Sequence, residues 1–262
     1  MQWELLTAPK LLKARDECGG VAILPIGSLE RHGEHLPTGI DTIAAHRKCV
    51  AAAERERAVV LPPLFYSNVI EMKNNIGAVP LDTMVLFRMV ENILDEVARN
   101  GFRKIILVSG HGGNRYWLPL LMQHLGDKDK DYAVYLARPQ MSEGDRKELA
   151  DLRESDVPEL HAGEMESSVA LYLVPEACDM EALPEEPGTT RKGTDVPAYT
   201  PIEWYSFFPE AYAGDAGPAS AEKGKRAFEL AVGALVEVIR SVKADESVLE
   251  HSKRFNREAR SL

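Results

Sequence analysis

The chain alternates short apolar runs with longer stretches in which apolar residues recur at helical spacing. Each short run is bounded by Gly, Pro or polar residues, which is typical of a buried strand. These runs are 21–26, 58–61, 104–109 and 133–136. The predicted helices cover 42–56, 81–100, 114–125, 143–156, the later part of 161–172, and 219–241. Strands that alternate with helices predict an α/β fold whose parallel sheet is covered on both faces.

Two long segments show neither the short apolar run of a strand nor the apolar spacing of a helix. Residues 65–80 contain Asn, Gly and Pro and are predicted to form a loop, which at this length is often functional. Residues 181–217 combine Pro and Gly with many aromatic side chains. We expect the aromatic part, 199–212, either to line or cover a pocket or to form an oligomer contact.

Composition narrows the class of protein. A net charge of −10, with the acids spread along 262 residues, argues against nucleic acid or an anionic membrane as a partner. No apolar run approaches the roughly 20 residues that span a bilayer, and the N-terminus lacks a signal-peptide core. The three cysteines are far apart and form no disulfide framework, which fits a reducing cytosol. We therefore expect a cytoplasmic protein, and in the absence of repeats or linkers a single domain over 1–262.

The stretch 21–41, VAILPIGSLERHGEHLPTGID, carries the most distinctive chemistry. A predicted strand ends at Gly27, and Glu30, His32 and Asp41 follow within a short distance. Carboxylates and imidazoles bind divalent metals, and ligands gathered after a strand end are where open α/β sheets place their sites. The alternative, equally weighted on this stretch alone, is a solvated polar loop in which Asp41 caps the next helix.

Two further stretches add candidate ligands. SGHGGN places His111 directly after a predicted strand, followed by Gly112 and Gly113. It is either part of a site or a plain strand-to-helix turn, and a phosphate-binding P-loop is excluded because no Lys-Ser/Thr follows the glycines. HAGEMESS offers His161, Glu164 and Glu166, although acids in a first helical turn also occur merely because they suit the helix dipole.

Taken together, the three stretches predict a dinuclear metal site. Loops that follow parallel strands collect at one edge of the sheet. The predicted metal ligands are Glu30, His32, Asp41, His111 and Glu166, enough for two ions, and a carboxylate such as Asp41 can bridge two cations about 3.5–4 Å apart.

These stretches resemble the signature blocks of the creatininase (creatinine amidohydrolase) family. GSLERHGEHLPTGID is similar to G-S-x-E-x-H-G-x-H-L-P-x-x-x-D, HAGEMESS is similar to H-A-G-x-x-E-[TS]-S, and SGHGGN matches the second block. Residues 214–224 resemble the C-terminal block with an altered middle. The resemblance implies a three-layer α/β/α sandwich with a mostly parallel sheet, a homo-oligomer that is often a hexamer, and a metal-dependent hydrolase of non-peptide C–N bonds.

By position, the resemblance implies that Glu30, Asp41 and His111 hold one ion, and that His32 and Asp41, completed by Glu166, hold the other. The metal is expected to be Zn, Mn or Fe, because all three accept these ligand types. A hydroxide held by the ions would attack a carbonyl carbon of a small-molecule substrate.

The chemistry of the residue types suggests roles for further residues near the ligands. His161 is the expected proton shuttle, and the backbone N–H groups of Gly112 and Gly113 are expected to stabilise an oxyanion. Glu164 is either a second acid/base or a helix-start acid, and His35 either orients a ligand or lies on the surface.

Departures from creatininase itself argue against creatinine as the substrate. Gly112 and Gly113 stand where creatininase carries a Tyr and a metal-binding Glu, and 157–160 stands where it carries a Trp with acidic residues. The expected activity is hydrolysis of a cyclic amide. The alternatives are ring-opening C–C hydrolysis of a cyclic diketone such as an oxidised inositol, deformylation of a formamide, or metal binding without catalysis.

Overall fold

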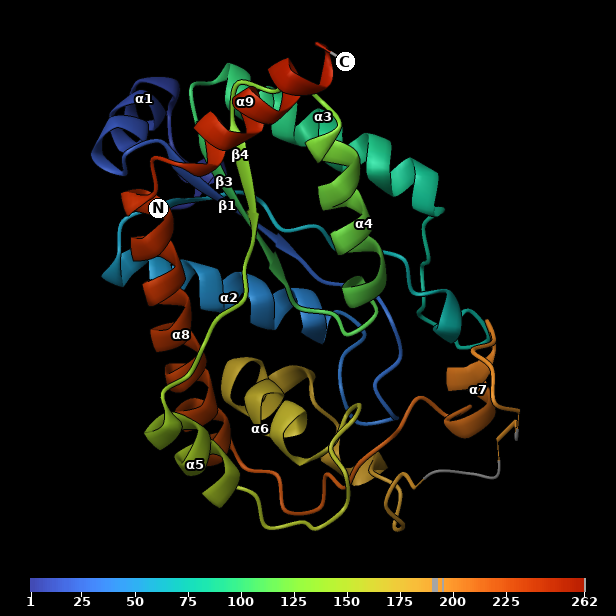
Figure 1. Cartoon of the computed structure of the whole chain (residues 1–262). Coiled ribbons are helices and arrows are strands. Elements are labelled where there is room, and N and C mark those ends of the chain that lie inside the picture. Colours follow the sequence, from blue (N-terminus) through green and yellow to red (C-terminus); the bar gives the residue numbers. More distant parts are fainter. Residues whose placement is uncertain (190–192, 195, 262) are drawn as a thin grey trace.

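The computed structural model describes residues 1–189, 193–194 and 196–261 (Figure 1). Within these ranges four parallel strands form a sheet in the order β2-β1-β3-β4. The strands are β1 (Val21–Ile26), β2 (Val59–Val60), β3 (Lys104–Ser109) and β4 (Ala133–Leu136). The predicted strands and their parallel arrangement are confirmed. The central strands β1 and β3 pair from Val21 with Lys104 to Ile26 with Ser109, so both end at the same edge.

Helices connect the strands and cover both faces of the sheet. They are α1 (Ala8–Glu17), α2 (Ile40–Arg55), α3 (Thr83–Arg99), α4 (Asn114–Gly126), α5 (Glu143–Asp151), α6 (Glu164–Leu173), α7 (Glu203–Phe207), α8 (Ala221–Ala244) and α9 (Val248–Ala259). Short 3₁₀ turns are η1 (Trp3–Leu5), η2 (Ile70–Met72), η3 (Pro175–Ala177) and η4 (Met180–Ala182). In Figure 1, α3 and α4 lie on one side of the strands and α8 lies on the other. The three-layer α/β/α prediction is confirmed.

The two layers are held by alternate residues of the strands. Side chains of successive strand residues point to opposite faces of a sheet. Leu24 of β1 and Leu107 of β3 belong to the buried cluster formed with α3 and α4, whereas Ile23 and Ile106 belong to the cluster formed with α2 and α8. All four side chains are buried, so the sheet has no solvated face in this region.

Local signals explain several helix boundaries. The Asp82 carboxylate accepts hydrogen bonds from the N–H groups of Met84 and Val85, so it is the N-cap of α3. Gly101, with φ +93°, follows the end of α3 in a left-handed conformation that favours glycine. The N–H groups of Glu154 and Ser155 donate to the Glu164 carboxylate instead of a helical carbonyl, which explains why the predicted helix 143–156 ends at Asp151.

Three helices lie outside the predicted set, and one of them is the short α7 within the segment 181–217. The charged tail after α8 forms α9, whose Asn256 is buried and donates to the Lys128 carbonyl at 3.4 Å. Near the N-terminus, α1 packs Ala14 into the α3 and α4 cluster. Both α1 and α9 contain many charged residues and few large apolar ones.

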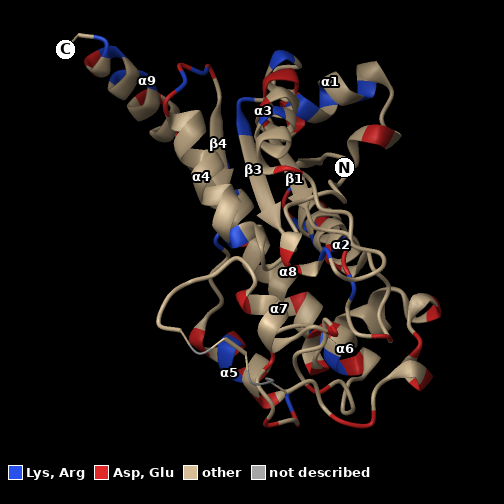
Figure 2. Ribbon diagram, turned by 90° about the vertical axis from the view of Figure 1, so that its right-hand side faces the viewer, with Lys and Arg blue, Asp and Glu red and all other residues tan. Residues whose placement is uncertain are grey.

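The surface charge agrees with the composition. Asp and Glu are distributed over many elements and do not form a single tail (Figure 2). No helix in the described ranges is long and apolar enough to cross a bilayer. Within the segment 181–217, positions 190–192 and 195 lie outside the described residues.

Candidate metal centre

The predicted ligands meet at the edge where β1 and β3 end. Glu30 and His32 come from the loop after β1, His111 from the loop after β3, and Asp41 and Glu166 from the first turns of α2 and α6. The ligand atoms of these five residues and of His161 form three groups, in each of which the atoms lie within 4.8 Å of one another. The groups are Glu30, Asp41 and His111; His32, Asp41 and Glu166; and Glu30, His32 and His161.

Two glycines position Asp41 between the strand ends. A Cβ atom at Gly27 would lie 2.2 Å from the Thr42 hydroxyl oxygen, and a Cβ atom at Gly110 would lie 2.4 Å from the Asp41 carbonyl oxygen. Any larger residue would push the start of α2 out of this gap. The glycines therefore allow the first turn of α2 to enter between β1 and β3, which brings the Asp41 side chain to the centre of the site.

The carboxylate of Asp41 faces two imidazoles from different loops. Its Oδ1 lies 3.2 Å from Nε2 of His32, and its Oδ2 lies 3.1 Å from Nδ1 of His111. All three side chains are buried. A carboxylate that directs opposite oxygens at two separate ligand sets has the arrangement of a bridging ligand in a two-metal site.

Each imidazole also faces a second carboxylate. Nδ1 of His111 lies 2.5 Å from Oε1 of Glu30, and Nε2 of His32 lies 3.6 Å from Oε1 of Glu166. The other oxygen of Glu166 accepts a hydrogen bond from the Ala162 N–H at 2.6 Å, which fixes this side chain. The site therefore divides into two halves, each with one imidazole and one terminal carboxylate, that share Asp41.

A serine that the sequence did not single out supports the half of the site that contains His111. The Ser28 hydroxyl lies 2.8 Å from Oε1 of Glu30 and 2.7 Å from Oδ2 of Asp41. Ser28 is fully buried. Because one hydroxyl has one proton, it donates to one of these oxygens at a time. Its position in the motif G-S-x-E could have identified it from the sequence. The contacts indicate that Ser28 orients the two carboxylates.

The carboxylates of the site stabilise positive charge on the imidazoles beside them. Burial alone lowers the pKa of His111, but hydrogen bonds and the charges of Asp41 and Glu30 raise that pKa to about 10. Burial likewise opposes the charged form of His32, yet Glu166 and Asp41 raise its pKa well above the ordinary value. For Asp41, the charge of His32 and the hydrogen bond from His111 outweigh burial and hold the carboxyl pKa well below its usual range.

This donor set fits divalent cations. Within the described part of the chain, ion pairs to Glu30, Asp41 and Glu166 come from histidine only, with no Lys or Arg. Buried carboxylates require a compensating charge. Nitrogen and oxygen donors of this kind hold Zn²⁺ or Mn²⁺, and such cations would take the place of the imidazole protons.

His161 lies beside the second half of the site. Its ring stacks on that of His32 with 4.1 Å between centroids, and its Nε2 lies 2.8 Å from the Arg31 carbonyl oxygen. Because a carbonyl can only accept, Nε2 carries a proton and Nδ1 of the neutral ring is the accepting nitrogen. In this tautomer Nδ1 can accept a proton, and the proton-transfer role of His161 stays a prediction.

Comparisons with known proteins agree with this geometry. The creatininase family model, described as creatinine amidohydrolase, matches residues 4–239. A creatinine amidohydrolase of Pseudomonas putida is 29% identical and aligns over 84% of this chain and 88% of its own length. A 3-dehydro-scyllo-inosose hydrolase of Thermotoga maritima is 26% identical over 92% of this chain and 83% of its own length. A solved structure named "Creatininase Mn" superposes with a TM-score of 0.77 at 25% identity, covering 93% of this chain and 99% of that one.

The chain belongs to the creatininase family.

Creatininase-family membership confirms the resemblance of the three sequence blocks and the prediction that the chain is a hydrolase. The three blocks carry residues that the structure brings together, as described above for Asp41, His111 and Glu166. The finer assignments of metal and substrate stay predictions.

The contacts of Glu164 are with neighbouring segments of the chain and not with the metal ligands. Its carboxylate is fully buried and accepts hydrogen bonds from the N–H groups of Glu154 and Ser155 and from Nζ of Lys223 at 2.6 Å. These contacts tie α6 to the end of α5 and to α8. They fit the alternative of a helix-start acid with a structural role, and they leave Glu164 without a contact to the metal ligands.

Gly112 and Gly113 form the turn between β3 and α4, with Gly113 as the N-cap of α4. Within the described residues their two N–H groups make no hydrogen bond, whereas the N–H of Asn114 donates to the His111 carbonyl. The Asn114 side chain holds this turn against the end of β1 by donating to the Ile26 carbonyl at 3.0 Å. The turn thus presents two unused N–H donors beside His111.

His35 lies behind the ligands and not on the surface. Its Nε2 is 2.9 Å from the Ser167 hydroxyl oxygen, and the ring packs edge-on against Tyr212. Ser167 follows Glu166 in α6, so this contact is consistent with the expected orienting role.

Two segments without a sequence period cover the site. Trp204 of α7 packs edge-on against His161, with 6.0 Å between ring centroids, and η2 carries Glu71 to within 3.8 Å of His111. The elements α7 and η2 contact each other. Trp204 of the segment 199–212 thus lies beside the site, and whether this segment lines a pocket or forms an oligomer contact stays a prediction. Glu71 was not singled out from the sequence. The only signal available was that it belongs to 65–80, a long predicted loop.

Proposed function

We propose that this protein is a metal-dependent amidohydrolase that cleaves a cyclic, non-peptide C–N bond of a small molecule with two divalent cations in the site described above. One observation carries the proposal, namely that the two oxygens of Asp41 face His32 and His111 separately. That arrangement provides for two ions that share one carboxylate.

The chain's own residues supply binding and orientation. Glu30 and His111 would hold one cation and His32 and Glu166 the other, with Asp41 shared. When bound, the cations would supply Lewis-acid polarisation of a substrate carbonyl and a hydroxide nucleophile near neutral pH. Zn²⁺, Mn²⁺ and Fe²⁺ all suit these ligands.

Proton transfer and charge stabilisation fall to residues around the ligands. Nδ1 of His161 is the nitrogen that accepts a proton from the nucleophilic water and returns it to the leaving nitrogen, while the Arg31 carbonyl holds the ring in that tautomer. The N–H groups of Gly112 and Gly113 lie at the start of α4, where a helix favours negative charge, and would donate to the oxyanion.

The indole N–H of Trp204 favours a substrate that carries a hydrogen-bond acceptor. Trp204 stands edge-on to His161 and its indole Nε1 is buried without a hydrogen-bond partner among the described residues. A buried indole N–H needs an acceptor, which a substrate carbonyl would provide. Because Gly112 and Gly113 replace larger groups of creatininase, we propose a substrate other than creatinine.

A ring-opening C–C hydrolase is the second candidate. The hydrolase of 3-dehydro-scyllo-inosose named above aligns over 92% of this chain, and the same ligands would serve a cyclic diketone. Hydrolysis of a formamide would also use them.

The test is product analysis with metal-loaded protein on three substrate sets, namely cyclic amides, cyclic diketones and formamides. The proposal expects ring opening of a cyclic amide, with a new carboxylate and a new amine on the same product, in an amount that falls to background after chelation. A ring-opened acid formed only from diketones would select the second candidate. Formate release would select deformylation, and no turnover of any set by fully metal-loaded protein would contradict the hydrolase assignment for these substrates.

A further inference from the structure

The outer nitrogen of His111 is buried and lacks a partner. Nδ1 of this ring faces Glu30 and Asp41, so Nε2 points away from both carboxylates. Among the described residues Nε2 makes no hydrogen bond, and it is shielded from solvent. When Nδ1 serves as a ligand, the neutral ring carries its proton on Nε2. A buried N–H donor of this kind requires an acceptor.

Glu71 is the carboxylate that faces this nitrogen. Its Oε1 lies 3.8 Å from Nε2 of His111, and its side chain is 24% exposed. This distance exceeds a hydrogen bond, but a movement of less than about 1 Å would bring the two atoms to bonding distance. Glu71 belongs to η2, far in sequence from the loops that supply the other ligands.

Gly113 keeps the space between Glu71 and His111 open. A Cβ atom at this position would lie 2.4 Å from Nε2 of His111 and 2.7 Å from Oε1 of Glu71. Even an alanine would therefore displace one of the two side chains. The backbone of the turn is thus compatible with a direct contact between the carboxylate and the imidazole.

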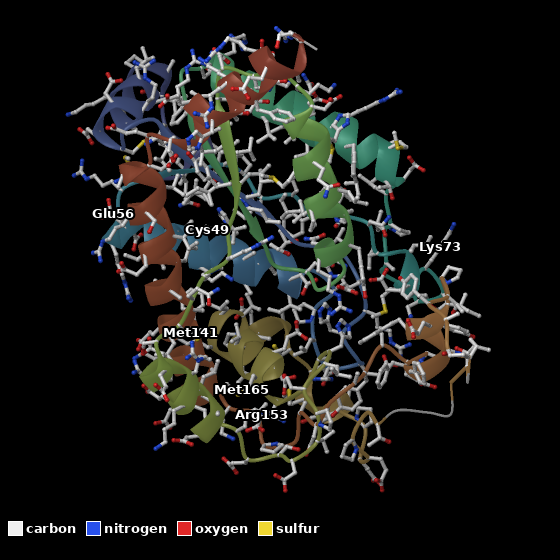
Figure 3. The ribbon with its side chains drawn as sticks, viewed as in Figure 1. Cys49, Glu56, Lys73, Met141, Arg153 and Met165 are labelled. Carbon is white, nitrogen blue, oxygen red and sulfur yellow. The ribbon has the colours of Figure 1, made fainter. Side chains whose placement is uncertain are left out.

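The position of η2 is fixed by contacts on two sides. Val69 and Met72 are buried in a cluster with Ala211, against which Trp204 packs. The Ser67 hydroxyl is hydrogen-bonded to the Asn114 side chain at the start of α4. Figure 3 labels Lys73 at the C-terminal end of η2, close to α7. Glu71 is therefore a side chain on an anchored turn.

We propose that Glu71 is a positioning residue for the metal centre, which accepts a hydrogen bond from Nε2–H of His111 and so directs Nδ1 of that ring at the cation. This inference rests on the proposed metal site. It gives the segment 65–80, which supplies no metal ligand, a role in orienting the His111 ring. A carboxylate behind a ligating imidazole fixes the ring and increases its basicity as a ligand.

The test measures Zn²⁺ affinity of the full chain by competition with a chromophoric chelator, for the wild type and for Glu71→Ala, Glu71→Gln and Ile70→Ala. Glu71→Ala is expected to weaken Zn²⁺ binding by about 10- to 100-fold at unchanged stoichiometry. Glu71→Gln retains an accepting oxygen and is expected to recover part of this loss. Ile70→Ala changes an exposed side chain of the same turn and is the matched control, expected to bind as the wild type does.

A second readout separates positioning from a general effect on packing. In protein with ¹⁵N-labelled histidine, NMR of the Zn²⁺ form is expected to show the His111 proton on Nε2, slow to exchange in the wild type and fast in Glu71→Ala. Wild-type affinity in Glu71→Ala would overturn the inference. Loss of one equivalent of Zn²⁺ at saturation would also overturn it, because Glu71 would then be a direct ligand. If the wild type itself binds no Zn²⁺, the metal centre fails as well, so the two failures are distinguishable.

Discussion

Nδ1 of His111 lies 2.5 Å from Oε1 of Glu30, and both side chains are buried. In the metal-free protein this pair is held together by a proton on the imidazole. Burial disfavours that proton, but the hydrogen bonds and charges of Asp41 and Glu30 outweigh burial and raise the pKa of His111 to about 10. A cation and a proton therefore compete for the same nitrogen.

Metal affinity should rise with pH as a result. Below its folded-state pKa, His111 is protonated and must release a proton before Nδ1 can bind a cation. We expect the Kd for Zn²⁺ to fall by roughly tenfold per pH unit for each proton released between pH 6 and pH 8. Isothermal titration calorimetry in buffers of different ionisation enthalpy counts the released protons. A Kd independent of pH, with no proton released, would contradict this account of His111.

The gap between the strand ends predicts a specific sensitivity at Gly110. In Gly110→Ala the new Cβ would lie 2.4 Å from the Asp41 carbonyl oxygen and 2.6 Å from Cβ of Ala45. We expect the free energy of unfolding to fall by about 1–3 kcal/mol, and metal binding to weaken because the start of α2 is displaced.

The matched control for this prediction is Gly233→Ala in α8. A Cβ there has nothing within 4 Å, so the change should stabilise the helix by about 0.5–1 kcal/mol. Urea unfolding of the two metal-free variants measures both effects. Equal stability of Gly110→Ala and the wild type would mean that the gap can widen freely, contrary to the packing described here.

His161 should affect turnover without affecting metal content. Its predicted function is proton transfer through Nδ1, and its Nε2 is held by the Arg31 carbonyl. We expect His161→Gln to reduce kcat by about 10²- to 10⁴-fold on whichever substrate the wild type accepts. Metal content should stay at the wild-type value, which elemental analysis of the same preparation checks. Loss of a metal equivalent would instead identify His161 as a ligand.

His35 should make the metal-free protein less stable in acid. Desolvation by burial is the main reason that its pKa falls from 6.5 to about 4 in the folded chain. The Ser167 hydroxyl donates to the Ala162 carbonyl and so accepts from Nε2 of His35, which leaves Nδ1 buried without a partner among the described residues. Between pH 6.5 and 4 the unfolded chain binds the proton more readily, so stability is full above pH 6.5 and decreases as the pH falls. The loss amounts to about 3 kcal/mol.

Comparison with His35→Asn isolates this contribution from other titrating groups. Unfolding free energies of the two metal-free proteins, measured at several pH values, should converge or cross as the pH falls from 6.5 to 4. Parallel curves over that range would show that His35 does not titrate as described.

Sequence patterns predicted the strands and the placement of the ligands because both depend on local signals. The run Val21–Ile26 is apolar at every position but Pro25, and its end determines where Glu30 and His32 emerge. Asp41 entered the predicted set through its place in a motif. The close approach that makes it central depends on Gly27 and Gly110, whose contacts with α2 are visible only in three dimensions.

Other features of the site arise from tertiary contacts that no local pattern encodes. Glu71 reaches His111 because η2 packs against α7, and Trp204 reaches His161 from the same pair of elements. Glu164 shows the converse. It shares a first helical turn with Glu166, yet the two side chains leave α6 on different sides, toward Lys223 and toward His32. Spacing alone does not separate these two acids.

The central claim is that Asp41 joins two cations, and metal content per chain tests it most directly. Protein purified without chelator and then supplied with Zn²⁺ or Mn²⁺ should contain close to two equivalents by elemental mass spectrometry. Asp41→Asn, which keeps the size of the side chain but removes its charge, should contain clearly fewer. Two equivalents in both proteins would contradict the bridging role of Asp41, and a wild-type content near zero that added metal cannot raise would contradict the metal centre itself.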